Sequence, residues 1–126
     1  MIEYTVRVYT DGTKFWYLND KYHREDGPAV ERADGTKSWF LNGKRHREDG
    51  PAIEYADGTK YWCLNDKYHR EDGPAIEYAD GTKFWCLNGK YLTQEEHQSA
   101  TNPAKEMTMA ELSALLGYEV KIVKES

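Results

Sequence analysis

A unit of 23 residues recurs along the chain without insertions, and this periodicity constrains the fold more than any other feature. The tripeptide Asp-Gly-Thr begins at Asp11, Asp34, Asp57 and Asp80. A fourth, partial copy over 80–91 follows three complete copies, over 11–33, 34–56 and 57–79. Self-similarity at such a period is typical of repeat arrays, in which each unit buries its apolar surface against its neighbours.

Each unit contains turn signals separated by runs of strand length. The pair Asn42-Gly43 is typical of a two-residue hairpin turn, Ala-Asp-Gly-Thr of a second turn, and Glu-Asp-Gly-Pro of a third break. Runs such as 14–18 and 52–55 alternate and are rich in aromatic and β-branched residues. We therefore predict a mostly β fold: a single twisted antiparallel meander sheet of roughly eight or nine strands, with about two strands per repeat.

Both ends of such an array must be capped. Residues 1–10 are expected to form an N-terminal cap strand that resembles the tail of a preceding copy, since Ile2-Glu3-Tyr4 is similar to Ile53-Glu54-Tyr55. Residues 92–126 are expected to form a C-terminal helix-strand cap.

Three local signals support this C-terminal cap. Thr93-Gln94-Glu95-Glu96 is a capping box that predicts a short helix near 94–99. A second capping box begins at Thr108 and predicts another helix, and alternation over 118–124 predicts a strand. The cap either closes the open end of the sheet or serves as an oligomerisation element.

Alternation along the first strand of each unit separates its two faces. One face carries the same residues in every unit, namely Trp16, Leu18, Trp39, Leu41, Trp62, Leu64, Trp85 and Leu87. The other face varies and is mostly aromatic, with residues such as Phe40 and Tyr61. We expect the invariant face to be tightly packed, and the aromatic face to be covered in part by the cap and otherwise by a partner or a second copy.

Composition argues against several classes of protein. Aromatic residues make up 13% of the 126 residues, which argues against a disordered chain. The formal net charge of -5 argues against a long nucleic acid as partner, and no apolar run reaches the ~18 residues of a membrane span. Residues 1–4 lack the charged and apolar regions of a signal peptide, so we expect a cytoplasmic protein.

The recurring histidines and cysteines are not expected to bind metal or to form a disulfide. His23, His46 and His69 occupy equivalent positions two strands apart, and roughly 10 Å is too far for sharing one ion. Each is expected to bond a turn carbonyl or a carboxylate within its own repeat. Cys63 and Cys86 are separated in the same way and are interpreted as small apolar side chains in a reducing compartment.

The candidate functional residues are cationic and aromatic. The chain contains no nucleophile elbow, phosphate loop or zinc-protease motif, so we predict that it is not an enzyme and needs no cofactor. The ladder of Arg24, Arg47 and Arg70 beside Glu25, Glu48 and Glu71 is interpreted as ion pairing within and between repeats. The alternative is that this ladder and its neighbours grip a small anionic nucleotide. The candidate binding residues are Tyr22, Arg24, Phe40, Arg45, Arg47, Tyr61, Tyr68 and Arg70.

The run from Asn42-Gly43-Lys44-Arg45-His46 to Ala56-Asp57-Gly58 resembles the MORN repeat. The resemblance covers residues 11–91 and implies a two-stranded hairpin per unit and a role in interactions. The chain departs from that family where Lys-x-Trp-x-Leu replaces a glycine-rich first strand and His-Arg-Glu-Asp-Gly-Pro-Ala replaces His-Gly. It therefore looks like a divergent, MORN-like subtype, and its units also resemble repeats in uncharacterised bacteriophage proteins.

These observations favour a non-catalytic protein-interaction module that engages another protein or itself. The resemblance to bacteriophage proteins further implies an inhibitor or sequestering factor that acts on a host component, such as a defence protein, in the host cytoplasm. Two alternatives are a small-molecule binder that captures an anionic nucleotide and a purely structural spacer.

Overall fold

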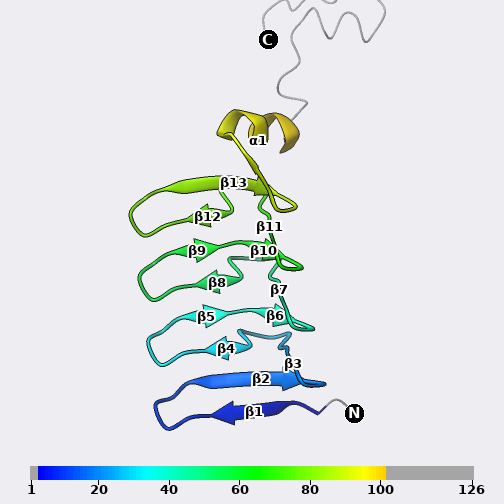
Figure 1. Ribbon diagram of the computed structural model, residues 1–126, viewed down its shortest axis with the longest axis vertical. Coiled ribbons are helices and arrows are strands. Elements are labelled where there is room, and N and C mark those ends of the chain that lie inside the picture. Colours follow the sequence, from blue (N-terminus) through cyan, green and yellow to red (C-terminus); the bar gives the residue numbers. More distant parts are fainter. Residues whose placement is uncertain (1–2, 102–126) are drawn as a thin grey trace, which may run out of the picture.

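The computed structural model describes residues 3–101, which form an elongated stack of short strands with a helix at one end (Figure 1). The first strands are β1 (Thr5–Val8), β2 (Lys14–Leu18), β3 (Lys21–Tyr22), β4 (Val30–Glu31), β5 (Lys37–Ser38), β6 (Phe40–Leu41) and β7 (Lys44–Arg45). The remaining elements are β8 (Ile53–Glu54), β9 (Lys60–Tyr61), β10 (Cys63–Leu64), β11 (Lys67–Tyr68), β12 (Ile76–Glu77), β13 (Lys83–Leu87), β14 (Lys90–Leu92) and helix α1 (Gln94–Thr101).

A ten-stranded antiparallel sheet runs along the whole stack. Its strand order is β1-β2-β4-β5-β8-β9-β12-β13-β14, with β3 paired to β2. The segments that leave this path form two further hairpins, β6–β7 and β10–β11. The prediction of a mostly β fold, built as an antiparallel meander from the repeats, is confirmed.

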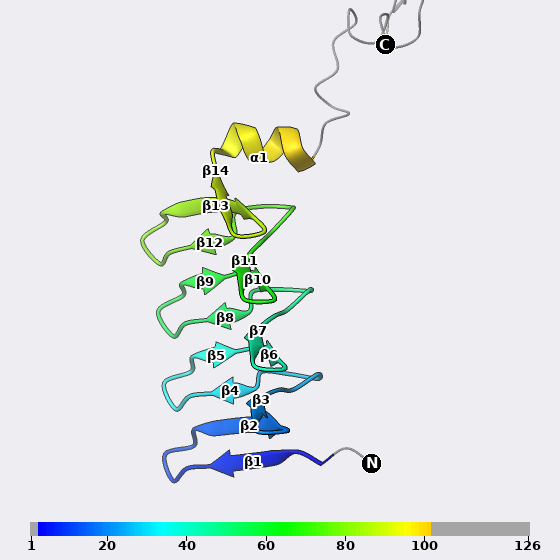
Figure 2. The ribbon, with the colours of Figure 1, turned by 45° about the vertical axis from the view of Figure 1, so that its right-hand side comes forward.

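The hairpins β6–β7 and β10–β11 form a second column beside the ten-stranded sheet, which is the main column. The sequence pattern did not predict this second column. In the second repeat the strand over 37–41 is divided at Trp39 into β5 and β6. The Trp39 N–H donates to the Ala52 carbonyl at 2.7 Å, and its own carbonyl accepts the His46 N–H at 3.0 Å. Since these two bonds point in different directions, the chain passes at Trp39 from β5 in the main sheet to the hairpin β6–β7, which lies beside it (Figure 2).

The predicted hairpin turns form, and local chemistry explains them. Asn42 and Gly43 have φ angles of 52° and 81°, and two positive values are what a two-residue turn between twisted strands requires. In the Ala-Asp-Gly-Thr turn, the Asp34 carboxylate accepts the Thr36 N–H at 2.9 Å. The Thr36 hydroxyl oxygen then accepts the Ala56 N–H at 3.2 Å, which ties the beginning of this repeat to its end.

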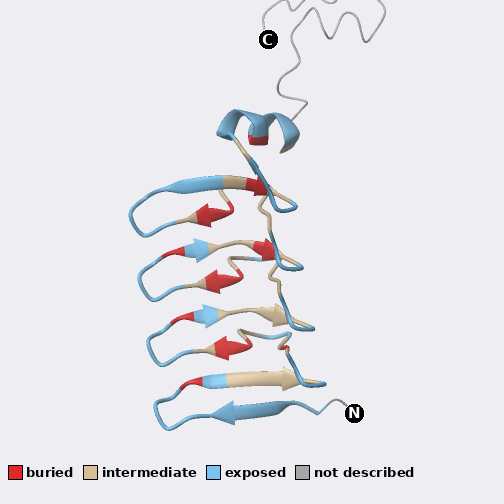
Figure 3. Ribbon diagram, in the orientation of Figure 1, coloured by how far each residue is buried: buried red, intermediate tan, exposed pale blue. Residues whose placement is uncertain are grey.

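The core consists of small and β-branched side chains. The buried positions recur from repeat to repeat along the stack (Figure 3). The buried apolar members of the core are Ala29, Val30, Ala52, Ile53, Cys63, Ala75, Ile76 and Cys86. The prediction that the invariant Trp–Leu face is the tightly packed one is wrong, because Trp39 and Trp62 are only half-buried. Within residues 3–101 no second layer covers that face, and charged side chains lie over the tryptophan rings instead.

The histidines link adjacent repeats as well as bonding within their own. The Nε2 atom of His46 lies 3.3 Å from the Glu48 carboxylate, so the predicted bond to a carboxylate of the same repeat is confirmed. Its Nδ1 atom accepts the Asn65 N–H of the next repeat at 3.0 Å. Since Nδ1 accepts, Nε2 carries the hydrogen and donates to the carboxylate.

Helix α1 covers the C-terminal end of the described stack, where it packs against β13 and β14. The predicted capping box is present: the Thr93 N–H donates to the Glu96 carboxylate at 2.9 Å, and the Glu96 N–H donates back to the Thr93 hydroxyl at 3.1 Å. His97 is buried, and its Nε2 atom bonds the Arg70 carbonyl at 2.6 Å. The second predicted helix and the strand over 118–124 lie outside the described residues.

The N-terminal cap strand β1 aligns with the repeats in a different frame from the predicted one. The Tyr9 N–H donates to the Thr13 carbonyl at 2.9 Å, as the Tyr55 N–H does to the Thr59 carbonyl. Tyr9 is therefore the counterpart of Tyr55, so the expected match of Ile2-Glu3-Tyr4 to Ile53-Glu54-Tyr55 is wrong. Arg7 takes the place that a buried Ile or Val takes in the later repeats.

Candidate functional site

The structure divides the eight candidate binding residues between two sides of the stack. Arg24, Arg47 and Arg70 lie on the tryptophan side, with the Arg47 Cζ atom 3.8 Å from the centre of the Trp39 ring. The other five lie on the opposite side and are Tyr22, Phe40, Arg45, Tyr61 and Tyr68. The two groups are therefore not brought together into one site.

Each arginine of the ladder has partners for its charge, its donors and its flat face. The Arg47 Nε atom donates to Asp49 at 3.1 Å, and Nη1 donates to the Pro51 carbonyl at 3.1 Å and to Glu54 at 3.0 Å. The same set of bonds recurs at Arg24 and Arg70. Ion pairing of the ladder within each repeat is confirmed, but its predicted pairing between repeats is wrong, because both carboxylate partners of each arginine lie in its own repeat. An ion pair that does join two repeats lies outside the ladder, between the Arg45 Nε atom and Asp66 at 3.0 Å.

The carboxylates that hold the arginine ladder differ from the predicted ones. Arg47 does not pair with the adjacent Glu48, because that carboxylate bonds His46 instead. Its partners lie two and seven residues further along the chain, at Asp49 and Glu54. A partner seven residues away is brought close only by the turn of the Glu-Asp-Gly-Pro loop, which sequence adjacency does not reveal.

The glycine of the Glu-Asp-Gly-Pro loop makes room for this arrangement. A Cβ atom at Gly50 would lie 2.9 Å from the Arg47 Cζ atom, and one at Gly73 would lie 2.9 Å from the Arg70 Cζ atom. Only a residue without a side chain leaves the guanidinium free to lie flat between the loop and the tryptophan ring. The loop and the tryptophan therefore form one structural unit in each complete repeat.

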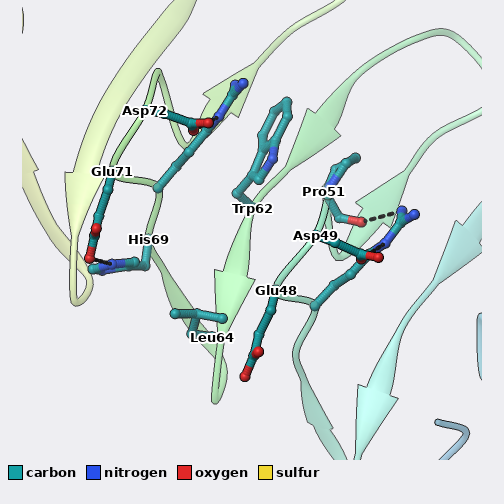
Figure 4. Close-up of a pocket in the computed structure, with 11 residues that line it drawn as sticks. Glu48, Asp49, Pro51, Trp62, Leu64, His69, Glu71 and Asp72 are labelled. Atoms are coloured by element: carbon teal, nitrogen blue, oxygen red, sulfur yellow. Dashed lines mark hydrogen bonds and ion pairs between the residues drawn. The ribbon is translucent and has the colours of Figure 1, made fainter.

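Grooves lie between the loops of successive repeats, with a tryptophan and a leucine in each. One groove, of about 630 Å³, is bounded by the loops over 47–51 and 69–72 and includes Trp62 and Leu64 (Figure 4). A second, of about 650 Å³, occupies the same position one repeat earlier. In the first groove two guanidinium charges face four carboxylates, from Glu48, Asp49, Glu71 and Asp72, which leaves a net charge of -2. This charge disfavours an anionic ligand.

The opposite side of the stack presents a run of aromatic rings packed mostly edge to face, which we call the aromatic face. Its residues are Phe15, Tyr17, Tyr22, Phe40, Tyr55, Tyr61, Tyr68, Tyr78, Phe84 and Tyr91. Neighbouring ring centres lie close together, at 5.1 Å for Tyr22–Phe40 and 5.8 Å for Phe84–Tyr91. Arg45 lies between the two halves of this face, with its Cζ atom 5.7 Å from the Tyr68 ring centre.

The aromatic face is accessible, especially towards the C-terminal end. Tyr78 is 38% exposed, Phe84 39% and Tyr91 56%. Sequence reasoning did not include these three, or Tyr55, among the candidate binding residues. The signal was available, because Tyr55 and Tyr78 lie two residues after Ile53 and Ile76 and therefore point to the same side of the sheet.

Close packing raises the pKa of three tyrosines on the aromatic face. Burial, followed by the neighbouring Tyr78 hydroxyl, raises the pKa of Tyr61 to about 12. Burial also raises the pKa of Tyr17 and Tyr91 above the ordinary value.

These tyrosines predict a loss of stability in alkali. In the unfolded chain they ionise near pH 10, whereas the folded chain keeps them protonated to higher pH. The unfolded state then binds fewer protons, so the free energy of unfolding falls as the pH rises from about 10 towards about 12. Urea unfolding followed by circular dichroism across this pH range measures the fall. A free energy of unfolding that stays constant up to pH ~12 would contradict the packing of these rings.

Cys63 and Cys86 are free thiols, and both are fully buried. Burial raises the pKa of the Cys63 thiol to about 11 and raises that of Cys86 as well. Since the thiolate is the reactive form, we expect both to react with a disulfide reagent at least roughly a hundredfold more slowly in the folded chain than in urea. A thiol that reacts equally fast in both states would show that the core is open.

Known proteins give no guide to this site. No family model, curated protein or solved structure matches the chain. Among residues 3–101 no group of three His, Cys, Asp or Glu side chains is placed to hold a metal ion, and no helix is both long and apolar enough to cross a membrane.

Proposed function

We propose that this chain is a non-catalytic protein-interaction module that binds its partner through the aromatic face. The observation that carries the proposal is the accessible, contiguous set of rings at its C-terminal half, formed by Tyr55, Tyr78, Phe84 and Tyr91. Exposed apolar patches of this kind mark interaction sites, and aromatic residues are enriched where proteins bind one another.

The rigidity of these rings supports a role in binding. Tyr78 packs edge-on against both Tyr61 and Phe84, so its side chain is already ordered before any partner arrives. A surface that is ordered in advance loses less conformational entropy on association. The hydroxyl groups of the tyrosines can supply hydrogen bonds to a protein partner at the same surface.

The contacts on the tryptophan side also favour the aromatic face as the binding surface. Arg24, Arg47 and Arg70 are occupied by carboxylates, carbonyls and tryptophan rings, so they offer little to a ligand. That side is the scaffold, and the aromatic face is the surface left for recognition.

We propose a bacterial host as the origin of the partner protein, because of the sequence resemblance described above. The MORN-like units and their similarity to bacteriophage repeats favour a bacterial host protein, which this module would inhibit or sequester in the host cytoplasm. This step rests on analogy of sequence, whereas the choice of surface rests on the exposure and packing of the rings.

Capture from a bacterial lysate with matched variants tests the choice of surface. The double variant Tyr78→Lys/Tyr91→Lys adds two positive charges to the aromatic face, and Glu48→Gln/Glu71→Gln makes the same charge change in the first groove. We expect a defined protein to be retained by the wild-type chain and the groove variant and lost by the face variant. Retention by the face variant, or loss with the groove variant, would contradict the proposal. Equal melting temperatures of the three chains control for folding.

An anionic nucleotide is the weaker candidate ligand. The net charge of the first groove is -2, and its two arginines are already paired. We therefore expect millimolar ATP to leave the melting temperature unchanged, because only a ligand that binds the native state stabilises it. A concentration-dependent rise that is lost in Arg47→Ala would reverse this ranking.

A further inference from the structure

In the part of the chain that the structure describes, the N-terminal end of the stack has an open strand edge, which distinguishes it from the C-terminal end. Among residues 3–101, β1 pairs with β2 and with no other strand, whereas helix α1 packs against β13 and β14 at the other end. All four residues of β1 are exposed, with Val6 at 38% and Val8 at 63%. An exposed edge strand of this kind is a template for pairing with another strand.

The register of β1 fixes which backbone groups face outward. Arg7 is paired with Phe15 and Val6 with Trp16. The Trp16 N–H donates away from β1, to the Ala29 carbonyl at 2.7 Å. Because bonded and non-bonded pairs alternate in an antiparallel ladder, Arg7 bonds to β2 and Val6 directs its N–H and carbonyl to the open edge. By the same alternation, Val8 directs its groups outward too, and so does Tyr4 when pairing extends β1 by one residue.

The residues along this edge are complementary to themselves in the reverse direction. If an antiparallel second copy is centred on Thr5, then Val6 lies opposite Tyr4 of the second copy, and Arg7 lies opposite Glu3 of the second copy. Tyr4 and Val6 both have outward backbone groups, so each such pair forms two hydrogen bonds. The opposed charges of Glu3 and Arg7 attract in both symmetry-related positions.

Other registers lose this complementarity. Centring the pair on Val6 places Arg7 opposite Thr5 and removes both ion pairs. Centring it on Arg7 places like charges directly opposite each other, which destabilises the pairing. Charge therefore selects the register centred on Thr5.

We propose that β1 pairs with β1 of a second copy of this chain in that register, forming a two-fold symmetric dimer with one continuous sheet. A two-fold axis perpendicular to the sheet keeps the same face of both copies on the same side. Arg7 lies on the side of the aromatic face, with its Cζ atom 5.7 Å from the Tyr17 ring centre. The dimer thus joins two aromatic faces into one surface, a consequence that rests on the proposed function, whereas the pairing itself does not.

The expected dimer is weak and reversible. One pair of short strands buries less than the roughly 1,200 Å² at which stable interfaces begin. Sedimentation equilibrium over a roughly hundredfold range of concentration should therefore show the mass of the wild-type chain rising from that of one copy towards that of two. High salt should lower the dimer fraction, because the ion pairs are exposed.

Charge reversal tests the register. We expect Glu3→Arg and Arg7→Glu each to raise the dissociation constant about tenfold, because attraction becomes repulsion at two symmetric positions. The double variant Glu3→Arg/Arg7→Glu should restore dimerisation, since the opposed charges return in reversed order. Glu95→Arg, on exposed α1, makes the same charge change elsewhere and should leave the dimer unaffected.

A backbone variant tests the edge independently of charge. Val6→Pro removes an outward N–H without removing a bond to β2, so it should abolish the dimer and leave the melting temperature nearly unchanged. A wild-type chain that is a monomer at every concentration would overturn the proposal. So would a dimer that survives both single reversals and Val6→Pro. If such a dimer is lost in Tyr78→Lys/Tyr91→Lys, the aromatic face is the self-association surface, and the outcome contradicts the edge pairing alone.

Discussion

Replacement of Trp62 by alanine is expected to lower the free energy of unfolding by about 3 kcal/mol, at the low end of the range for a large aromatic side chain. The ring packs against the cluster of Ala75, Ile76 and Cys86, and the Arg70 guanidinium lies 3.9 Å from its centre. Removing it opens a void beside the core and leaves the guanidinium without its stacking partner. Urea unfolding of both chains, followed by circular dichroism, measures the difference.

Tyr91→Ala provides the matched control for this experiment. Tyr91 is also a large aromatic residue, but it is 56% exposed and lies on the aromatic face, so we expect a loss of about 1 kcal/mol or less. If Trp62→Ala lowers the free energy of unfolding no more than Tyr91→Ala does, the tryptophan side is not the scaffold. The groove around it would then replace the aromatic face as the candidate binding site.

Replacement of Ile76 by alanine is expected to cost about 3 kcal/mol, since Ile76 is among the most deeply buried side chains, at 2% exposure. It lies across the strands from both Tyr61 and Phe84, and so joins the third repeat to the fourth. In a repeat array stability depends on such contacts between neighbours, so the loss should fall on the C-terminal end first. Hydrogen exchange should then rise in β13 and α1 before it rises in β2.

Ile76→Val is the conservative control, because a valine, Val30, occupies the equivalent position in the first repeat. We expect it to cost about 1 kcal/mol. Equal losses for the two variants would mean that these positions do not form a packed core.

Local chemistry explains why much of the fold was predictable. The turn at Asn42-Gly43 requires positive φ at both positions, and few residue pairs other than this one adopt it readily. The helix that begins after Thr93 was predictable because a capping box uses residues only three apart. Because the same motifs recur every 23 residues, a turn predicted in one repeat is predicted in the others as well.

Features that depend on long-range contacts were not predictable in this way. The change of column at Trp39 depends on bonds to Ala52 and His46, which adjoin two different strands, β8 and β7. The bond from the Asn65 N–H to His46 spans 19 residues and joins two repeats. Alternation along a strand records which residues share a face, but not whether anything covers that face.

The candidate site illustrates the same limit. Tyr61 was found because aromatic residues on the variable face are visible in the strand pattern, whereas Tyr68 was chosen as a neighbour of the arginine ladder in the sequence. Their separation from Arg47 and Arg70 follows from the loops, which fold the guanidinium groups back over the tryptophans on the other side. Arg7 occupies the position at which later repeats bury an isoleucine or a valine. A charged residue is tolerated there because β1 is exposed at the edge of the described sheet.

The central claim is that the aromatic face binds a protein partner while the tryptophan side serves as scaffold. Hydroxyl-radical footprinting of a small amount of tagged chain, in buffer and in excess bacterial lysate, tests it most directly. We predict that Tyr78, Phe84 and Tyr91 lose reactivity in the lysate, whereas Trp39 and Trp62 keep theirs. Protection of the tryptophans with the aromatic face still reactive, or no difference between the two conditions, would contradict the claim.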